Sequence, residues 1–564
     1  MRHQPLQRVT RLPAPPGRMP PGHLPPIDLR ATPPDPRLID RLGPLCCAET
    51  GLLPWRQAGG VTVIAAAQAD VYSRHAPMLG ELFGPVVMVL APEAAIRAAL
   101  VALRGAALVK AAETRAPAPL SCRHWKAEAG GRRLLLLAIV LDVVWLAPQP
   151  VVTGLLVWTL LTLALGTGLK AAAVLAALRP APPEGPPPVI ARLPCVSILV
   201  PLLHETGIAA KLVGRLARLD YPSGLLDIVL VVEEGDRTTA ETLAAARLPP
   251  TMRVVTVPGG PLKTKPRALN FALPFCRGEF IGVYDAEDAP APDQIRRIVT
   301  RFHQRGEQVA CLQGRLDFYN VRSNAMSRCF AVEYATWFRL VLPGLARLGL
   351  PIPLGGTTLF FRRAALEAVG GWDAHNVTED ADLGLRLARL GYRAELIDSD
   401  TLEEATCHPR GWVRQRSRWI KGYMVTWIVH SRRPLRLWRD LGTWRTAGVQ
   451  VLFLGAISQA LLAPLLWACW LMTLGLPNPL AGMPAPVPQA AIGLFLLAET
   501  VNLAAAMIAC RAPQHRHLRR WVPALWLYFP LASLAALKAL WDLAGRPFHW
   551  DKTPHGLCDD LSGA

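Results

Sequence analysis

The sequence predicts an α/β domain with a mostly parallel sheet, inserted between transmembrane helices and preceded by a small α+β domain. Three observations lead to this prediction. The chain has 564 residues, of which 51% are hydrophobic, so it is too long for one domain and too apolar for a wholly soluble protein. Long apolar runs flank a segment of ordinary globular composition. In that segment, short β-branched runs alternate with helix-like stretches, as in proteins with a parallel sheet.

The first 125 residues divide into a leader and a small domain. Residues 1–34 are rich in proline and arginine and lack an apolar stretch, so we expect a disordered leader and no signal peptide. In residues 35–125 the apolar pattern changes every few residues, and a glycine pair precedes the strand-like run 61–64. We therefore expect a small mixed domain that serves in docking or regulation.

This small domain resembles the amino-terminal domain of type II secretion and pilus ATPases. The resemblance rests on Arg41-Leu42-Gly43 and on the run from Gly51 to Trp55. Some relatives of that domain bind cyclic di-GMP, so the resemblance implies an export partner or cyclic di-GMP bound through residues 35–125. The spacing after Gly43 departs from the relatives' repeat by one residue, and short motifs often match by chance, so a docking module is the preferred interpretation.

Two membrane crossings are expected over residues 132–178. Leu134 to Leu178 is almost uninterrupted apolar sequence, broken near Pro148, and at about 1.5 Å per residue it is long enough for two spanning helices. Basic residues lie at both ends of the pair and none lies in the turn, so both ends should face the cytoplasm. A proline-rich linker over residues 179–190 then leads to the globular segment 191–440.

Apolar blocks return over residues 446–543, where we expect transmembrane or interfacial helices. The basic connector near Arg516 should lie in the cytoplasm, and the uncharged connector 477–486 on the opposite side. The last block contains Pro523, Pro530 and Lys538, so three arrangements are open: it spans the membrane, re-enters it or lies on its surface. The arrangement determines on which side of the membrane the tail 544–564 lies. We expect a multi-pass protein of a bacterial-type inner (plasma) membrane, with the globular segment in the cytoplasm.

Charge and cysteine content argue against other classes of protein. The formal net charge is +19, but charged residues make up only 18% of the chain, and the lysines and arginines are dispersed. We attribute the basicity to contact with anionic membrane lipid and expect no nucleic-acid partner. The eleven cysteines form no CxxC pair, so neither a disulfide framework nor a zinc site is predicted.

Acidic residues follow the predicted strands of the globular segment. Glu234 and Asp236 follow one strand, and Asp285 and Glu287 follow another. The carboxyl ends of parallel strands form the ligand-binding edge of an open α/β sheet. Asp285 and Glu287 would present two carboxylates to Mg²⁺ or Mn²⁺, which prefer oxygen ligands and would bridge a diphosphate. Taken alone, this motif also has a purely structural interpretation, in which the acids lie in a solvated turn between the strand and the next helix.

A second acidic motif, Thr378-Glu379-Asp380, precedes leucines that recur on one helical face. The alternative is again structural, because Thr378 would cap the helix and the acids would favour its positive end. In the catalytic interpretation, Asp380 is a general base that takes the proton of an acceptor hydroxyl as its oxygen attacks an anomeric carbon. One base opposite a departing diphosphate gives inversion in a single displacement.

The third motif is a basic and aromatic cluster that contains Gln415, Arg418 and Trp419 and lies just before the second group of apolar blocks. Its structural alternative is a juxtamembrane patch with interfacial tryptophans. In the catalytic interpretation, Trp419 supports a sugar ring, and Gln415 and Arg418 hold polar groups of the acceptor or the diphosphate.

Together the three motifs resemble family 2 glycosyltransferases, and most closely the membrane-embedded, cellulose synthase-like branch, over residues 194–421 and the flanking spans. The resemblance implies a type-A, Rossmann-like glycosyltransferase fold. It implies that Asp285 and Glu287 bind metal, with Glu287 in place of the usual second Asp, and that Asp380, beside Glu379, is the catalytic base. It further implies that Glu234, Asp236, Lys265 and Asp285 bind the donor, and that Gln415, Arg418, Trp419, Gly356 and Thr357 bind the acceptor or the diphosphate.

The expected function is inverting transfer of a sugar from a nucleotide-diphosphate donor to a growing polysaccharide, with processive synthesis and export. Two alternatives remain open. One is a single transfer to a lipid-linked acceptor, and the other is a catalytically silent membrane scaffold or cyclic di-GMP receptor. The intact acidic motifs argue against the silent protein. The tail from Phe548 to Gly556 resembles the mobile loop of cellulose synthases, an analogy that requires a cytoplasmic tail.

Overall fold

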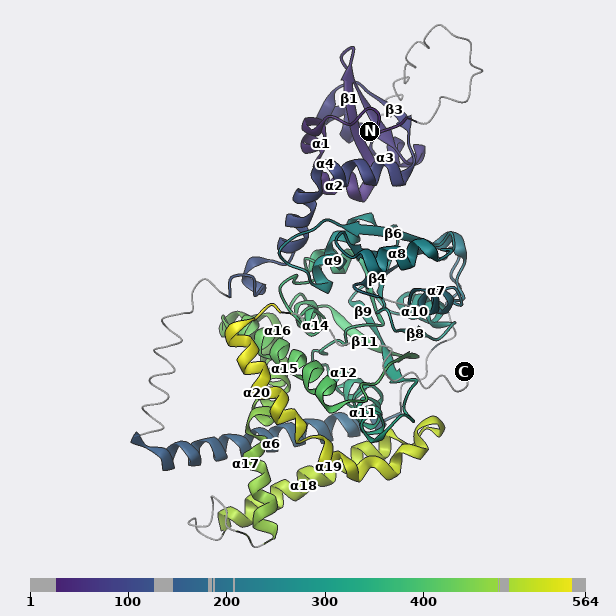
Figure 1. The fold of residues 1–564 in the computed structure, drawn as a ribbon. Helices are drawn as coiled ribbons and strands as arrows, with labels where there is room; N and C mark the ends of the chain where they lie inside the picture. Colours follow the sequence, from purple (N-terminus) through teal and green to yellow (C-terminus); the bar gives the residue numbers. More distant parts are fainter. Residues whose placement is uncertain are drawn as a thin grey trace. The chain divides into compact units, whose positions relative to one another are not determined.

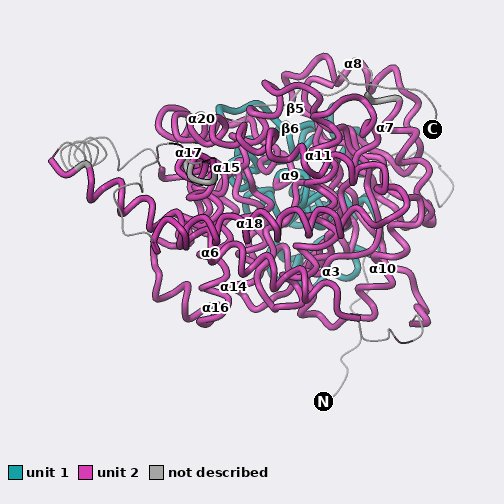
Figure 2. The backbone as a smooth tube through the Cα atoms, turned by 90° about the horizontal axis from the view of Figure 1, so that it is seen from below, with its two compact units in different colours: residues 1–112, 256–261, 271–276 teal, residues 113–255, 262–270, 277–564 magenta. Residues whose placement is uncertain are grey.

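The computed structural model (Figure 1) describes residues 27–125, 146–180, 185, 188–205, 208–474, 476 and 486–549. The expectations for the leader before residue 27, for the first membrane crossing before residue 146 and for the tail motif beyond residue 549 lie outside these residues. The chain divides into two compact units (Figure 2): residues 1–112, 256–261 and 271–276 form the first, and the remaining residues form the second.

The first unit contains a small three-stranded sheet in the order β1 (Leu52–Ala58), β2 (Val61–Ala66), β3 (Val86–Leu90). β1 and β2 form an antiparallel hairpin whose turn is Gly59–Gly60, and both glycines have positive φ. β3 is parallel to β2 and is reached through α3 (Ala69–Phe83), which buries Tyr72, Leu79 and Phe83. Helices α1 (Pro36–Leu42), α2 (Pro44–Thr50) and α4 (Glu93–Thr114) complete a mixed fold. The predicted small α+β domain is therefore confirmed.

An eight-stranded sheet forms the centre of the α/β domain. Its strands run in the order β6-β5-β4-β7-β10-β9-β11-β8. β4 is parallel to both β5 and β7, and β11 is parallel to β9, whereas β10 and β8 pair antiparallel with their neighbours. The strands are β4 (Val196–Leu202), β5 (Leu226–Glu233), β6 (Met252–Val257), β7 (Phe280–Val283), β8 (Ala289–Pro290), β9 (Val309–Phe318), β10 (Leu359–Arg362) and β11 (Arg393–Glu403).

Burial explains why the β-branched runs form the central strands. Every residue of β5 is buried, and all but one residue of β4 are buried, as expected where helices cover both faces of a parallel sheet. The core of this domain joins the strands to apolar side chains of α7 (Ile208–Leu216), α8 (Arg237–Ala245) and α10 (Gln294–Gln304). Its other helices are α9 (Lys265–Ala272), α11 (Ala325–Thr336), α12 (Leu342–Arg347), α13 (Arg363–Ala368) and α14 (Glu379–Arg389). Short 3₁₀ helices are η1 (Ala118–Leu120), η2 (Ser223–Leu225) and η3 (Leu273–Phe275), and η4 (Trp337–Val341) is a π-helical segment between α11 and α12.

Long helices precede and follow the α/β domain in sequence. Among the described residues, three segments are long and apolar enough to cross a membrane: Gln149–Leu178, Pro434–Trp467 and Pro486–Ala509. The last apolar block is a bent pair, Pro513–Tyr528 and Leu531–Gly545, with an angle of 50° at the break. These helices are α6 (Pro148–Leu178), α15 (Pro409–Ser431), α16 (Pro434–Val449), η5 (Gln450–Gly455), α17 (Ala456–Thr473), α18 (Pro486–Ala509), η6 (Pro513–Ala524), α19 (Leu525–Tyr528) and α20 (Leu531–Gly545).

Candidate active site

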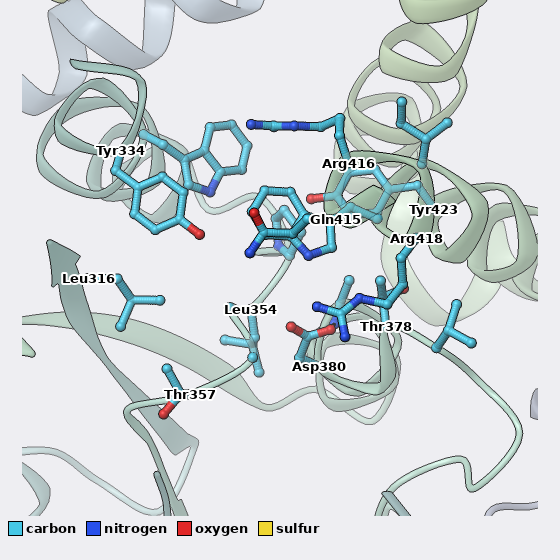
Figure 3. A pocket seen from close by; sticks show the side chains of 18 of the residues that line it. Leu316, Tyr334, Leu354, Thr357, Thr378, Asp380, Gln415, Arg416, Arg418 and Tyr423 are labelled. Atoms are coloured by element: carbon cyan, nitrogen blue, oxygen red, sulfur yellow. The ribbon is translucent and has the colours of Figure 1, made fainter. Parts of the chain in front are cut away.

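One cavity of about 690 Å³ collects residues from all three predicted motifs. Asp285 and Glu287 reach it from the loop after β7, and Asp380 reaches it from the first turn of α14. Gln415, Arg418 and Trp419 reach it from α15. Figure 3 shows Gln415 and Arg418 among the side chains that line the cavity. Carboxylates separated by about a hundred residues in the sequence therefore line the same space.

Lys265 joins the first acidic motif to the glycine loop before β10. Its Nζ donates to Asp285 Oδ1 at 2.5 Å and to the carbonyl oxygen of Gly356 at 2.6 Å. The backbone N–H of Asp285 donates to Asp288 Oδ2 and to Thr357 Oγ1, which fixes the turn. Burial lowers the pKa of Lys265, but the carboxylates of Asp285 and its neighbours outweigh burial and raise that pKa above its usual value. Lys265 therefore stays a cation in the cavity.

The two carboxylates of the first motif suit a cation that is shared with a substrate. Asp285 and Glu287 both line the cavity, and among the described residues no group of three or more acidic, histidine or cysteine side chains forms a closed metal site. Mg²⁺ and Mn²⁺ are often held by one or two carboxylates, with waters and substrate phosphates as the other ligands. This donor set fits such a cation.

The second motif presents two carboxyl groups with raised pKa values. Burial and the neighbouring Asp380 raise the pKa of Glu379 to about 7. Burial raises the pKa of Asp380 to about 6, although Lys265 and Arg418 act in the opposite direction. Figure 3 shows the Asp380 carboxylate and the Arg418 guanidinium turned toward each other. A carboxylate with a pKa near the working pH is well suited to accept a proton.

Gly356 keeps the loop beside Asp380 open. A Cβ atom at Gly356 would lie 3.4 Å from Asp380 Oδ2 and 3.9 Å from Lys265 Nζ. A larger side chain there would enter the space between the candidate base and the candidate donor-binding lysine. Thr357, the next residue, donates from Oγ1 to Asp288 Oδ2. The two loop residues therefore shape the site rather than supply a titratable group.

The α15 motif brings aromatic rings and cations to the cavity. The Trp419 ring lies 6.2 Å from the Phe330 ring and 6.3 Å from the Tyr334 ring, measured between centroids. Arg416 stacks over Trp419 and pairs with Glu333 at 2.7 Å. Gln415 Oε1 accepts from Thr406 Oγ1 at 3.2 Å. An aromatic face beside charged hydrogen-bond donors is a surface that can hold a sugar ring.

Two of the predicted donor-binding residues lie elsewhere. Neither Glu234 nor Asp236 lines the cavity. Asp236 is 2% exposed and caps α8, where its side chain accepts from the backbone N–H and the hydroxyl of Thr239 and from the backbone N–H of His204. The spacing of a cap residue and a threonine three positions later is a readable helix-start signal. The structure brings Glu233 and Glu205 to the cavity instead.

Two families of known domains match the chain. Residues 194–422 match the model described as "Glycosyltransferase like family 2", and residues 23–109 match the MshEN domain. The chain carries a family 2 glycosyltransferase domain. The glycosyltransferase match covers the α/β domain and the three motifs of the cavity, and the MshEN match covers the small domain whose resemblance to secretion ATPases the sequence indicates. The predicted family 2 glycosyltransferase domain is therefore confirmed, and the MshEN match fits the expectation for the small domain, whereas the cellulose synthase-like branch stays a prediction.

Curated relatives share the glycosyltransferase region. A beta-monoglucosyldiacylglycerol synthase of Trichormus variabilis is 31% identical over 264 residues, which cover 44% of this chain and 54% of that protein. Probable glucomannan 4-beta-mannosyltransferase 15 of Arabidopsis thaliana is 22% identical over 264 residues, which cover 44% of this chain and 48% of that protein. The chain therefore spans about half the length of these curated relatives.

A solved structure matches with lower similarity. The mannosyltransferase PcManGT from Pyrobaculum calidifontis, in complex with GDP-Man and Mn²⁺, has a TM-score of 0.40 and 19% sequence identity. The match covers 68% of this chain and 99% of that chain.

Glu403 is a residue of the glycosyltransferase domain that the motifs did not indicate. It ends β11 and lines the cavity, and its Oε1 is buried with no hydrogen-bond partner among the described residues. Burial, followed by the nearby carboxylates of Asp288, Glu287 and Asp285, raises the pKa of Glu403 well above its usual value. An acid at the end of a strand is a signal that the sequence offered, but Glu403 belongs to none of the three motifs.

The cavity also continues away from the sheet, between the apolar helices. Ala456, Ala460 and Ala463 of α17 line this part, and they recur on one face of the helix. Ala506 of α18 and Phe529, after α19, line it as well. We call this part, which is lined mainly by small and apolar side chains of α17, α18 and the α19–α20 region, the apolar arm. None of the three sequence motifs indicates this arm.

Proposed function

We propose that the protein is an inverting glycosyltransferase of a bacterial-type inner membrane that transfers one sugar from a nucleotide-diphosphate donor to the hydroxyl of a membrane-lipid acceptor. The observation that carries this proposal is the continuity of the cavity. Asp285 and Asp380 line one end of it, and the apolar arm forms the other. A lipid could place its chains in the arm and its hydroxyl beside Asp380. The relatives named as glucosyldiacylglycerol synthases support the same acceptor class.

The proposed chemistry begins at Asp380. With a pKa of about 6 this carboxyl is largely ionised near neutral pH, so it can take the proton of the acceptor hydroxyl. The acceptor oxygen then attacks the anomeric carbon from the face opposite the nucleoside diphosphate, whose oxygen keeps the electrons of the broken bond. Lys265 is placed to balance the negative charge of that leaving group. A Mg²⁺ or Mn²⁺ ion held by Asp285 and Glu287 would add a second positive charge there.

Polysaccharide elongation is the second candidate, and the α15 motif favours it. Gln415, Arg418 and Trp419 line the cavity next to Tyr334 and Trp412, so a chain of sugar rings would find aromatic faces there. The glucomannan mannosyltransferase named among the relatives supports a polymer in the same way. In that case the protein would be processive and would export its product through its own spans.

A non-enzymatic role is the candidate of another class. A silent scaffold or a cyclic di-GMP receptor would use the MshEN domain and have no need for ionised carboxylates in the cavity. The buried pair Glu379 and Asp380 with raised pKa values argues for catalysis, because such groups are costly unless they have a function. An export partner or cyclic di-GMP at residues 35–125 is compatible with either enzyme and would regulate it.

One experiment separates the three candidates. Membranes that contain the full chain are incubated with a panel of radiolabelled nucleotide sugars, with Mg²⁺, with Mn²⁺ or with a chelator, and the labelled products are sized. We expect a lipid-soluble product that carries a single sugar, and incorporation that depends on the metal. Labelled material of high molecular weight would overturn the lipid acceptor in favour of elongation. Absence of label with every donor, from correctly folded protein, would overturn both enzymes.

A further inference from the structure

Lys170 is a charged residue in an otherwise uncharged helix. It is the only acidic or basic residue between Gln149 and Leu178, the apolar segment of α6. Transfer of an ammonium group into apolar surroundings is costly, so a lysine in such a helix usually faces a polar partner, a cavity or the membrane interface. The position of Lys170 therefore calls for a specific explanation.

The partner of Lys170 is a neutral amide. Its Nζ donates to Asn502 Oδ1 of α18 at 2.6 Å. Within the part of the chain that the structure describes, no carboxylate lies within ion-pair distance of Nζ. Glu499 accepts from the indole N–H of Trp526, and Glu333 accepts from Arg416 and from Tyr528. The two acids whose charges act on Lys170 are thus hydrogen-bonded to other donors, and among the described residues its ammonium group contacts no carboxylate directly.

Lys170 and Asn502 both line the cavity that holds Asp380. An ammonium group has three N–H donors, and Asn502 accepts from one of them, so two are left for a ligand. The same cavity is lined by Ala506, one turn after Asn502 in α18, and by Val341 and Ala463, none of which carries a charge. The end of the cavity near Lys170 therefore combines an available cation with apolar walls.

The polar end of the cavity has its own cation for the donor. Lys265 is already paired with Asp285 and the Gly356 carbonyl, beside the predicted metal carboxylates. Lys265 and a metal ion would neutralise the charge of a nucleoside diphosphate at that end. The second cation, Lys170, lies among apolar helices and therefore suits a different anionic molecule. A group with a negative phosphate and long hydrocarbon chains fits both features of this end, since the phosphate matches the ammonium and the chains match the alanine-lined walls.

We propose that Lys170 binds the phosphate of an anionic membrane lipid whose hydrocarbon chains occupy the apolar arm. The inference rests on the proposed function and deepens it, because it specifies that the lipid in the site is a phospholipid rather than a neutral diacylglycerol. Asn502 orients the ammonium group toward the cavity. The lipid phosphate replaces water around Nζ and balances its charge.

The test compares two fluorescent lipids that differ in the phosphate. The full chain, purified in a non-ionic detergent, is titrated with labelled phosphatidylglycerol and with labelled diacylglycerol, and binding is followed by anisotropy. We expect Lys170→Met to weaken phosphatidylglycerol binding about tenfold, since it removes a charge-assisted hydrogen bond, and to change diacylglycerol binding less than about twofold. Lys170→Arg should retain most of the phosphatidylglycerol binding, because it keeps the cation.

A matched control uses another lysine on an apolar helix. Lys538 of α20 pairs with Asp542 and does not line the cavity, so Lys538→Met should leave the binding of both lipids unchanged. Equal weakening of both lipids by Lys170→Met would show a general packing defect and overturn the inference. Unchanged phosphatidylglycerol binding in Lys170→Met would overturn it as well. Full displacement of the lipid by millimolar inorganic phosphate would show that the site binds free phosphate. It would overturn the proposal that the phosphate at Lys170 belongs to a lipid.

The proposed function and this inference can fail separately. Sugar transfer by the unaltered protein tests the proposed function, whereas the ratio of the two lipid affinities in the Lys170 variants tests the inference. Asp380→Asn should lower transfer at least a hundredfold and leave the ratio of the two lipid affinities unchanged. Loss of lipid selectivity in Asp380→Asn would contradict the assignment of the phosphate to Lys170.

Discussion

At the scale of single residues, Asp380 is the side chain on which the proposed chemistry depends. It lines the cavity at the start of α14, and Oδ1 accepts from the backbone N–H of Ala381 at 2.8 Å. We expect Asp380→Asn to lower kcat at least a hundredfold, because the amide cannot accept the proton, and to leave donor binding nearly unchanged. Transfer of radiolabelled sugar and donor binding by calorimetry check the two halves of this prediction. Asp293→Asn, a surface substitution beside Arg297, is the control, and unchanged turnover in Asp380→Asn would reject its role as base.

The raised pKa of Asp380 also predicts the pH dependence of the reaction. Burial favours the neutral acid and raises the pKa to about 6, so the fraction of ionised base falls as the pH falls through that value. We expect kcat to be nearly constant above about pH 7 and to fall about tenfold for each pH unit well below 6. The measurement is kcat at saturating donor and acceptor across this range. A flat profile there, with the protein still folded, would contradict the assignment.

The first acidic motif predicts an effect on the affinity for the nucleotide sugar. Asp285 accepts from Lys265 and lines the cavity with Glu287, so Asp285→Ala removes one candidate metal ligand and leaves the lysine with the Gly356 carbonyl but without its carboxylate partner. We expect nucleotide-sugar binding to weaken about tenfold or more in the presence of Mn²⁺, because a charge-assisted contact is lost. Calorimetry with and without a chelator measures it. Donor binding by the unaltered protein that is indifferent to the chelator would exclude the metal.

At the scale of elements, the close approach of α14 and α15 positions the candidate base. A Cβ atom at Gly422 of α15 would lie 2.1 Å from Thr378 Oγ1, the residue that precedes α14, so only glycine fits. His430 of α15 also contacts Asp382 of α14, with 2.9 Å between Nε2 and Oδ1, and Asp382 accepts from Arg386 at 2.8 Å. These contacts fix the helix that carries Asp380 against the helix that carries the third motif.

Because the two helices approach so closely, the addition of a single methyl group at Gly422 should reduce stability and activity. Gly422→Ala should destabilise the protein by about 1–3 kcal/mol through overpacking and should lower kcat more than the donor affinity, since the shift falls on the start of α14. Gly214→Ala in α7 is the matched control, because nothing lies within 4 Å of its added methyl group. Thermal unfolding and steady-state kinetics on both variants provide the comparison. Wild-type stability in Gly422→Ala would show that the two helices can separate without cost.

Sequence patterns predicted these elements unevenly. The buried strands were predictable because their β-branched runs have to be covered on both faces. The first acidic motif was predictable because its acids follow a strand, whereas Asp380 opens a helix and the third motif lies within one. The antiparallel strand β10 (Leu359–Arg362) was not predicted, since it has four residues and its partners lie far away in the sequence. Glu233, rather than the predicted Glu234, lines the cavity, because a shift of one residue at a strand end changes the face that a side chain occupies. The shape of the cavity depends on helix packing, which no local pattern records.

At the scale of the whole molecule, the apolar arm connects the glycosyltransferase chemistry to the helices that are long enough to cross a membrane. Ala460 lines the arm from α17, between Ala456 and Ala463, so a larger side chain there would narrow the path without contact to Asp380 or Lys265. We expect Ala460→Phe to reduce transfer to lipid about tenfold or more, because the added ring fills space that the lipid chains would occupy. The affinity for the nucleotide sugar should not change. Leu465→Phe on the same helix does not line the cavity and controls for a general effect of a larger residue. Transfer to lipid at the normal rate in Ala460→Phe, in a protein of normal thermal stability, would mean that the acceptor reaches Asp380 by another path.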